Sequence, residues 1–542
     1  MTQNVTVVMG QIDPIVGDIS GNVDLIVAAA QKAKTLHQAD IIVFPEMTIT
    51  GYPPEDLLLR EGLYAQINSA LNKLCEQVKD IICVVGYPMM DDLGERFNMA
   101  AWIEEGTIQA SYMKQNLPNY SVFDEQRYFT EGHQPCVVEF NGIRFGLLIC
   151  EDIWKITPST QAKDAGADVI LNLNASPFSE EKHQDRIATL ERRVDEIKKP
   201  IIYVNQVGGQ DDLVFDGGSF AISADGEVCV QSPEFKTDLT AVQLVKQVDS
   251  VVMLEGEKSE LFEGEARVYE ALKLGVKDYV EKNGFPGVLL GLSGGIDSAL
   301  TLAIAVDALG ADKVEAIMMP FRYTAEISKE DAALQAKTMG VVYESLPIES
   351  MYNAFEKTLE PLFAGKDADL TEENLQARIR GTLLMAISNK NGKMVLATSN
   401  KSEVAVGYST LYGDMVGGFS PLKDVPKTLV YRLAQYRNSL SKCIPERVIT
   451  RPPSAELRPD QVDQDSLPDY DVLDEVIKQF VRLDKSPEEI VALGFDESEV
   501  RKVIRLIDRS EYKRRQSAPG VKITPRAFGR DRRYPITSHY VE

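Results

Sequence analysis

Short hydrophobic runs alternate with longer amphipathic stretches through the first half of the chain. Runs rich in Val, Ile and Leu, each short enough to be a buried strand, lie at 5–9, 41–44, 82–86, 144–149, 169–173 and 201–204. Helical periodicity fills several of the gaps between them, at 21–36, 63–78 and 183–198. Strands that alternate with helices in this way predict a layered α/β domain.

The second half repeats this alternation, with a glycine-rich turn after its first strand. The run 287–292 ends in Ser-Gly-Gly and passes directly into an amphipathic helix. Further strands are predicted at 314–319, 343–348 and 394–398, and helices at 328–339 and 372–390. We therefore expect a doubly wound parallel sheet of the Rossmann-like type. A polar, acidic stretch near 255–260 separates the halves, so the predicted domains are 1–255 and 256–542.

The composition is that of a globular protein, and it argues against several classes of site and partner. A chain of 542 residues is too long for one core, and its 44% hydrophobic and 26% charged residues are ordinary. We expect a cytoplasmic protein, because no apolar run reaches membrane length and the N-terminus lacks a signal-peptide pattern. The six scattered cysteines argue against a disulfide framework or a zinc site. The formal net charge of −24 argues against general nucleic-acid binding.

The turn Ser293-Gly294-Gly295-Ile296-Asp297-Ser298 has the features of a phosphate-binding loop. Gly294 and Gly295 allow the backbone to approach a bulky anion, and the N–H groups of the following helix attract negative charge. Ser293 and Ser298 add hydroxyl donors, and Asp297 is placed to hold Mg²⁺ on the phosphates. The turn lacks the lysine of a Walker-type loop. It resembles the loop of the ATP pyrophosphatase group, whose members adenylate a carbonyl oxygen and release pyrophosphate.

Three polar residues follow predicted strands of the first half: Glu46, Lys114 and Cys150. Ligands and catalysts gather at the carboxyl ends of strands in α/β folds, although sequence separation alone does not bring the three together. Three motifs in the same order resemble the nitrilase, or carbon–nitrogen hydrolase, superfamily: Pro45-Glu46-x4-Gly51-Tyr52-Pro53, Lys114-x2-Leu117-Pro118 and Cys150-Glu151-Asp152. The resemblance implies an αββα sandwich with a Glu-Lys-Cys triad that cleaves amides.

The same resemblance implies a role for each residue of the triad. Cys150 would attack an amide carbonyl, Glu46 would pass the thiol proton to the leaving ammonia, and Lys114 would stabilise the oxyanion. Further residues match an extra active-site carboxylate, Glu125, and the glutamine-holding positions of the glutaminase branch, Tyr120, Ser176, Lys182 and Arg186. Without the resemblance, Cys150 reads as core packing, Glu125 as a loop charge, and Lys182 and Arg186 as a solvated helix face.

Motifs of the second half, together with the glycine-rich turn, resemble NAD synthetase. They are Thr398-Ser399-Asn400-Lys401-Ser402-Glu403, Gly413-Asp414, the run from Pro421 to Lys427, and Ser454-Ala455-Glu456-Leu457. The resemblance implies that the 293–298 loop binds ATP with Thr398 and Lys401, and that Asp297 and Glu403 hold Mg²⁺. It also places Arg380, Asp414 and Lys427 at the deamido-NAD site. Without it, Glu403 and Asp414 are solvated charges.

The two halves together resemble the glutamine-dependent NAD synthetases. This resemblance implies that glutamine supplies ammonia, that ATP adenylates the carboxylate of deamido-NAD, and that ammonia displaces AMP to give NAD⁺. It also implies a homo-oligomer. One alternative is an amidase fused to another adenylating pyrophosphatase, such as a nucleobase amidotransferase or a tRNA-modifying enzyme, and the motifs at 398–403 and 414 argue against it. The other is a non-catalytic scaffold, against which the intact Glu46, Lys114, Cys150 and Asp297 argue.

Overall fold

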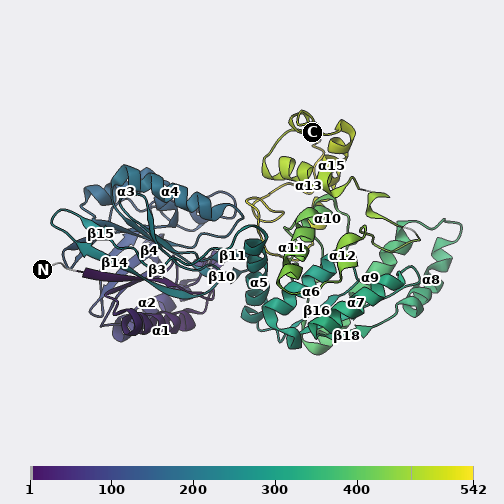
Figure 1. The fold of residues 1–542 in the computed structure, drawn as a ribbon, viewed down its shortest axis with the longest axis horizontal. Coiled ribbons are helices and arrows are strands. Elements are labelled where there is room, and N and C mark those ends of the chain that lie inside the picture. Colours follow the sequence, from purple (N-terminus) through teal and green to yellow (C-terminus); the bar gives the residue numbers. More distant parts are fainter. Residues whose placement is uncertain (1–3, 460, 466, 541–542) are drawn as a thin grey trace. The chain divides into compact units, whose positions relative to one another are not determined.

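The computed structural model describes residues 4–459, 461–465 and 467–540, and the chain divides into two compact units, Met1–Phe262 and Glu263–Glu542 (Figure 1). This division lies beyond the predicted boundary at 255/256, because residues after 255 still bond to the first unit. The backbone N–H of Gly256 donates to the Cys229 carbonyl at 3.1 Å, and that of Ser259 donates to the Gln231 carbonyl at 3.0 Å.

In its described part, the first unit is the predicted αββα sandwich (Figure 1). One sheet has the order β15-β14-β1-β2-β3-β4-β5 and the other β13-β12-β9-β8-β7-β6, with parallel strands at the centre of each and antiparallel strands outside. The strands are β1 (Asn4–Gln11), β2 (Ile41–Val43), β3 (Ile82–Met90), β4 (Arg96–Glu104), β5 (Thr107–Met113), β6 (Val137–Phe140), β7 (Ile143–Ile149), β8 (Val169–Asn174), β9 (Ile201–Asn205), β12 (Phe220–Ile222), β13 (Val228–Gln231), β14 (Asp238–Lys246) and β15 (Val251–Met253), with a separate hairpin of β10 (Val207–Gln210) and β11 (Leu213–Asp216).

The central strands of each sheet are buried on both faces, which explains why they read as continuous hydrophobic runs. In β1, Val5, Val7 and Met9 pack in the core between the sheets, whereas Val8 packs in the core beneath two helices. Those helices, α1 (Ile19–His37) and α2 (Glu61–Gln77), cover one side of the sandwich, and α3 (Ile156–Asp164) and α4 (Lys182–Ile197) cover the other (Figure 1).

The second unit contains the predicted parallel sheet, with the strand order β18-β17-β16-β19 in its described part. Its strands are β16 (Val288–Gly291), β17 (Val314–Met318), β18 (Val342–Ser345) and β19 (Met394–Val395). The chain moves outward from β16 to β18 and then returns to the other side of β16. This reversal creates a topological switch point between β16 and β19, and such points are where open α/β sheets bind ligands.

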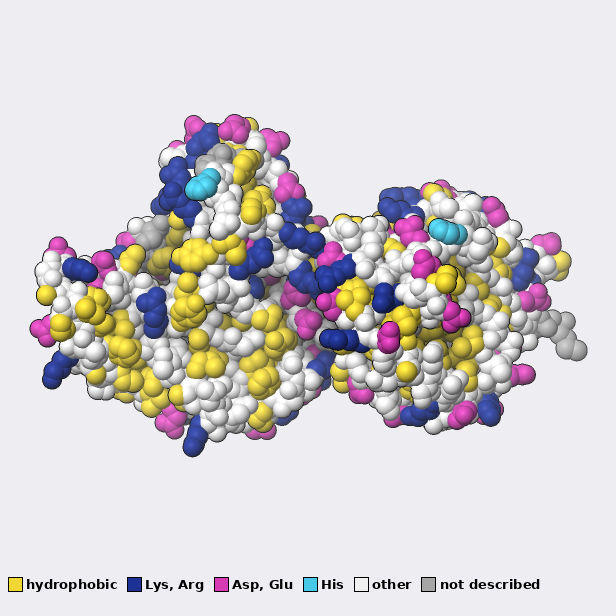
Figure 2. Space-filling view, turned by 180° about the vertical axis from the view of Figure 1, so that it is seen from behind, with side chains coloured by type: hydrophobic (Ala, Val, Ile, Leu, Met, Phe, Trp, Pro, Cys, Tyr) yellow, Lys and Arg dark blue, Asp and Glu magenta, His cyan; other side chains and the backbone are white. Residues whose placement is uncertain are grey.

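Helices make up most of the rest of the second unit. They are α5 (Gly264–Lys282), α6 (Ile296–Leu309), α7 (Glu326–Met339), α8 (Glu349–Phe363), α9 (Leu370–Asn391), α10 (Lys401–Val406), α11 (Lys427–Leu440), α12 (Glu446–Thr450), α13 (Tyr470–Ile477), α14 (Pro487–Val491), α15 (Glu497–Arg509) and α16 (Glu511–Arg514). Residues of α10, α13, α14 and α15 share a hydrophobic core separate from that of the sheet. Among the described residues, none of the helices is long and apolar enough to cross a membrane. Figure 2 shows patches of hydrophobic side chains on the surface of both units.

Candidate active sites

The first unit brings Glu46, Lys114 and Glu125 into direct contact. The Lys114 ammonium donates to Glu46 Oε1 at 2.7 Å and to both oxygens of Glu125 at 2.8 Å, and all three side chains are buried. Asn98 on β4 donates to Glu46 Oε1 at 2.7 Å, and Tyr52 donates to Glu125 Oε1 at 3.0 Å. Two carboxylates therefore share one ammonium, and neutral donors hold each of them in place.

Cys150 lies directly after β7 on a strained turn. Its backbone has φ of 42°, a left-handed conformation that a non-glycine residue adopts at an energetic cost and that is common at functional sites. The buried Asp152 supports the turn, because it accepts from the Ile149 N–H at 3.2 Å. The same carboxylate accepts from the Asn116 N–H at 2.8 Å and from the Tyr112 hydroxyl at 2.9 Å. Asp152 thus ties the cysteine turn to the loop that follows Lys114.

The charges around Cys150 act in opposite directions on its thiol. Burial raises the pKa of Cys150 well above its ordinary value, Glu46 raises it further, and Lys114 lowers it. Burial also raises the pKa of Glu125, with Lys114 opposing and Glu46 adding to the shift. The thiol therefore stays protonated until a neighbouring base removes its proton, and Glu46 is a carboxylate placed in the same buried group.

The predicted glutamine-holding residues are held by different partners. The Tyr120 hydroxyl donates to Glu151 Oε2 at 2.9 Å, and the Lys182 ammonium lies 4.1 Å from the centre of the Trp154 ring. Burial and the nearby Arg186 lower the pKa of Lys182, and Cys150 is among the groups that oppose this shift. Tyr120 and Lys182 therefore both contact the segment Cys150–Trp154, which begins with the cysteine. Their contact with glutamine stays a prediction.

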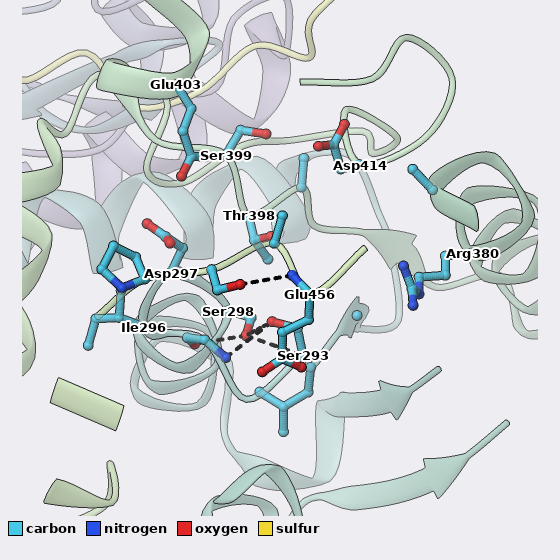
Figure 3. A pocket seen from close by; sticks show the side chains of 18 of the residues that line it. Ser293, Ile296, Asp297, Ser298, Arg380, Thr398, Ser399, Glu403, Asp414 and Glu456 are labelled. Carbon is cyan, nitrogen blue, oxygen red and sulfur yellow. Dashed lines mark hydrogen bonds between the residues drawn. The ribbon is translucent and has the colours of Figure 1, made fainter. Parts of the chain in front are cut away.

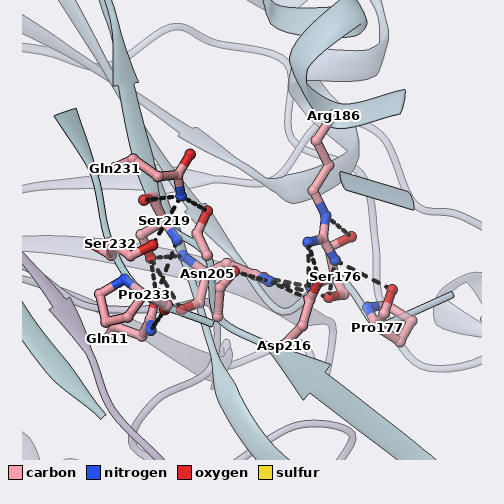
Figure 4. Close-up of polar contacts among 12 residues, drawn as sticks. Gln11, Ser176, Pro177, Arg186, Asn205, Asp216, Ser219, Gln231, Ser232 and Pro233 are labelled. Atoms are coloured by element: carbon pink, nitrogen blue, oxygen red, sulfur yellow. Dashed lines mark hydrogen bonds and ion pairs between the residues drawn. The ribbon is translucent and has the colours of Figure 1, made fainter. Parts of the chain in front are cut away.

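The guanidinium group of Arg186 donates its hydrogen bonds to buried groups of the protein (Figure 4). Its Nη1 donates to both oxygens of Asp216 at 2.8 and 2.9 Å, its Nε to Ser176 Oγ at 3.2 Å, and its Nη2 to the Ser176 carbonyl at 2.8 Å. Asn205 continues this network towards Asp216 and donates its backbone N–H to Ser219 Oγ at 2.9 Å. Arg186 thus holds Ser176 by its hydroxyl and its carbonyl. A direct contact of either residue with glutamine stays a prediction.

In the second unit, the glycine-rich turn borders a cavity of about 320 Å³ at the switch point of the sheet. Gly294 has φ of +83°, and a Cβ there would lie 2.3 Å from the Ser328 carbonyl oxygen, so only glycine fits. Ser293 and Ser298 share a hydrogen bond of 3.1 Å between their hydroxyls. The backbone N–H of Gly295 donates to Ser293 Oγ at 3.2 Å. The turn is therefore held by its own serines at the start of α6.

One lysine joins the two predicted metal ligands. The Lys427 ammonium lies 2.6 Å from Asp297 Oδ2 and 3.2 Å from Glu403 Oε1, and all three residues line the cavity. Asn400 donates to the other oxygen of Asp297 at 2.8 Å. Burial raises the pKa of Glu403, Lys427 lowers it and Asp297 raises it. The sequence predicted Lys427 at the deamido-NAD site; that contact stays a prediction, and its observed partners are the two carboxylates.

The remaining predicted residues divide into two groups. Thr398, Arg380 and Asp414 line the cavity, with Arg380 across from Asp297 (Figure 3). Burial lowers the pKa of Arg380 to about 10, so it remains a cation near neutral pH, and burial raises the pKa of Asp414 to about 6. Lys401 is not among the described residues that line the cavity. Its ammonium is buried against Asp424 at 2.6 Å and Thr524 at 2.8 Å, so the predicted contact with ATP would require these bonds to break.

Comparisons with known proteins cover both units. Residues 6–251 match the carbon-nitrogen hydrolase family, and residues 268–517 match the NAD synthase family. The chain is 52% identical over 540 residues to the glutamine-dependent NAD(+) synthetase of Acinetobacter baylyi, with 98% of each chain covered. The chain belongs to the glutamine-dependent NAD(+) synthetases. This confirms the resemblance found in the sequence.

Solved structures of this family agree with the fold. The glutamine-dependent NAD+ synthetase of Acinetobacter baumannii, in complex with ADP, has a TM-score of 0.81 and 51% identity, with 98% of each chain covered. The corresponding enzyme of Cytophaga hutchinsonii has a TM-score of 0.84 at 22% identity, covering 99% of this chain and 98% of that one. The second comparison concerns the fold alone.

In this member of the glutamine-dependent NAD(+) synthetases, sequence reasoning missed residues that hold the glycine-rich turn. Arg451 donates to the Gly294 carbonyl and, at 3.0 Å, to Ser328 Oγ. Ser328 donates in turn to Glu456 Oε1 at 2.6 Å. The motif containing Glu456 was noticed in the sequence, but its contact with Ser328 spans 128 positions. Arg451 had no local signal, because an arginine beside two prolines is typical of an exposed loop.

Proposed function

We propose that this chain converts deamido-NAD to NAD⁺ with ATP and with ammonia taken from glutamine. The observation that carries the proposal is the presence of two sites on one chain: Lys114 between Glu46 and Glu125 beside Cys150, and the 293–298 turn, which lines one cavity together with Glu403. Membership in the family supports the same reaction. We also propose a cytoplasmic homo-oligomer; the exposed Phe355, Leu362 and Leu370 provide apolar surface for such assembly.

The first unit is proposed to hydrolyse glutamine through a thioester. Glu46 takes the proton of Cys150, and the sulfur attacks the side-chain amide carbon of glutamine. Lys114 stabilises the negative charge that develops on the amide oxygen. Glu46 then gives its proton to the departing ammonia, and water cleaves the thioester to release glutamate. The strained backbone of Cys150 and the hydrogen bond from the preceding Ile149 N–H to Asp152 support this role, because they hold the cysteine turn at the end of β7.

The second unit is proposed to activate the carboxylate of deamido-NAD. A carboxylate oxygen attacks the α-phosphorus of ATP, pyrophosphate leaves, and ammonia then displaces AMP from the acyl carbon. The 293–298 turn and Thr398 would hold the phosphates, and Arg380 and Asp414, which line the same cavity, would contact deamido-NAD. A carboxylate is a poor electrophile, so this activation is what allows ammonia to react.

Mg²⁺ fits the residues that line this cavity. Asp297 and Glu403 come from different elements, yet both reach one ammonium, so their oxygens converge on one position. Among the described residues, no cluster of three or more His, Cys, Asp or Glu side chains could hold a metal ion alone. Mg²⁺ is usually held by one or two carboxylates together with substrate phosphates, which is the arrangement available here. When bound, it would neutralise charge on the triphosphate.

The test is NAD⁺ formation from deamido-NAD, ATP and Mg²⁺, with either glutamine or ammonium chloride as the nitrogen donor. We expect Cys150→Ala to lose the glutamine-dependent reaction and to keep the ammonium-dependent one. Cys229→Ala, which removes another buried thiol of the same unit, should keep both. No NAD⁺ from either donor with the native chain would refute the proposed synthetase activity. Glutamine-dependent activity in Cys150→Ala would refute the proposed nucleophile.

A further inference from the structure

Lys427 occupies the position between the two carboxylates to which a metal ion would be drawn. Its ammonium contacts Asp297 and Glu403 together, its side chain is 2% exposed, and it lies 5.3 Å from the centre of the Tyr470 ring. Its backbone N–H donates to Ser402 Oγ at 2.8 Å, at the first residue of α11. The lysine is therefore fixed at its base, while its flexible stem places the charge on the carboxylates.

We propose that Lys427 neutralises this carboxylate pair before ATP binds and thereby makes metal binding depend on ATP. The inference rests on the proposed function, because it takes Asp297 and Glu403 as the metal ligands. A divalent cation that entered without nucleotide would meet an ammonium already bound to the same oxygens. In a buried site, the repulsion between two cations at contact distance is strong. The free metal ion therefore binds weakly.

ATP changes this balance because it brings new anions into the same cavity. The turn at 293–298 and the side chains of Asp297, Glu403 and Lys427 all line it, so bound phosphates lie within the reach of the lysine stem. The ammonium can then move from carboxylate to phosphate, which frees carboxylate oxygens for the metal ion. By linkage, the metal ion and the nucleotide strengthen each other's binding by the same factor. Lys427 therefore allows the metal ion to bind together with the nucleotide.

The test measures Mn²⁺ binding to the full chain by electron paramagnetic resonance, without nucleotide and with α,β-methylene-ATP, which is resistant to cleavage at the bond that the reaction breaks. Mn²⁺ suits the same oxygen ligands as Mg²⁺. Lys427→Met removes the charge but keeps the length of the side chain. Without nucleotide, it should bind Mn²⁺ about tenfold more tightly than the native chain, a typical size for such coupling. Lys427→Arg keeps the charge and should resemble the native chain.

Loss of the ammonium leaves two carboxylates facing each other, so folding is measured in parallel by thermal unfolding. Mn²⁺ should raise the midpoint of Lys427→Met, or of Lys427→Gln if that variant is better folded, more than that of the native chain. Equal Mn²⁺ affinity and equal midpoint shifts in neutral variants and native chain would overturn the inference. A further variant, Asp297→Asn, tests whether the metal ion binds at this site at all. Unchanged Mn²⁺ binding by this variant with nucleotide would show that the metal ion binds elsewhere.

Discussion

At the level of single residues, Asp216 and Arg186 hold the segment that carries Ser176. Asp216→Asn removes the counter-charge of a completely buried guanidinium, which should cost about 3–5 kcal/mol of stability. Because Arg186 also donates to the Ser176 hydroxyl and carbonyl, the KM for glutamine should rise about tenfold or more, since one lost bond to a charged group is worth about 1.5–3 kcal/mol. The ammonium-dependent rate should not change. Initial rates of glutamate release give the KM and kcat.

Two controls separate positioning from stability. Asp24→Asn breaks the exposed ion pair with Lys73 in the same unit and should leave both stability and the KM nearly unchanged. The double variant Arg186→Met with Asp216→Leu replaces the buried pair with apolar groups, a change that often restores stability. It should still have a high KM for glutamine. A native KM in this double variant would mean that the pair serves only the fold.

The sequence predicts residues best where the backbone alone fixes their position. Glu46, Lys114 and Cys150 each follow a strand, where ligands and catalysts gather in α/β folds, so each position could be singled out from the sequence, although their contact could not. Arg186 could not be read in this way. On α4 it has the spacing of a solvated charge, and its partner Asp216 lies 30 positions later on another element. The same distance problem hid the contact of Lys427 with Asp297, which spans 130 positions.

At the level of elements, one ion pair fixes the C-terminal segment to the start of α10. Asp424 accepts from the Lys401 ammonium at 2.6 Å and from the backbone N–H groups of Ile523 and Thr524 at 2.9 and 2.7 Å. Lys401→Met should destabilise the second unit by about 3–5 kcal/mol, because it leaves Asp424 buried without its cation. Thermal unfolding measures this change. Lys329→Met, in an exposed pair with Glu326, should cost less than about 1 kcal/mol, and an equal loss in both variants would contradict the argument.

Strands with uniform hydrophobic runs were predicted, and a strand that a polar residue interrupts was not. The runs that became β1, β2, β3, β7, β8 and β9 are buried on both faces. In contrast, β4 contains the buried Asn98, whose amide holds Glu46, and this polar residue weakens the strand pattern. No helix or strand was predicted in the C-terminal segment 513–533 either. Its buried Val521, Ile523 and Phe528 acquire partners only through the tertiary fold.

At the level of the whole molecule, each unit has hydrophobic clusters of its own, so each should fold alone. We expect the fragment 1–262 to hydrolyse glutamine and the fragment 263–542 to make NAD⁺ from ammonium. A fragment ending at 255 should be less stable than 1–262. It would lose the Gln231 N–H bond to the Glu257 carbonyl at 2.9 Å, the Ser259 N–H bond to the Gln231 carbonyl at 3.0 Å, and the Phe235–Phe262 ring contact at 6.0 Å.

These contacts together should be worth about 2–4 kcal/mol, at about 1 kcal/mol for each hydrogen bond and for the ring pair. Circular dichroism during heating should therefore show a midpoint several degrees lower for the fragment 1–255 than for 1–262. Equal midpoints would mean that residues 256–262 are a linker. If instead neither 1–262 nor 263–542 unfolded cooperatively, each core would depend on the other unit, and the two activities could be separated only by point substitutions such as Cys150→Ala.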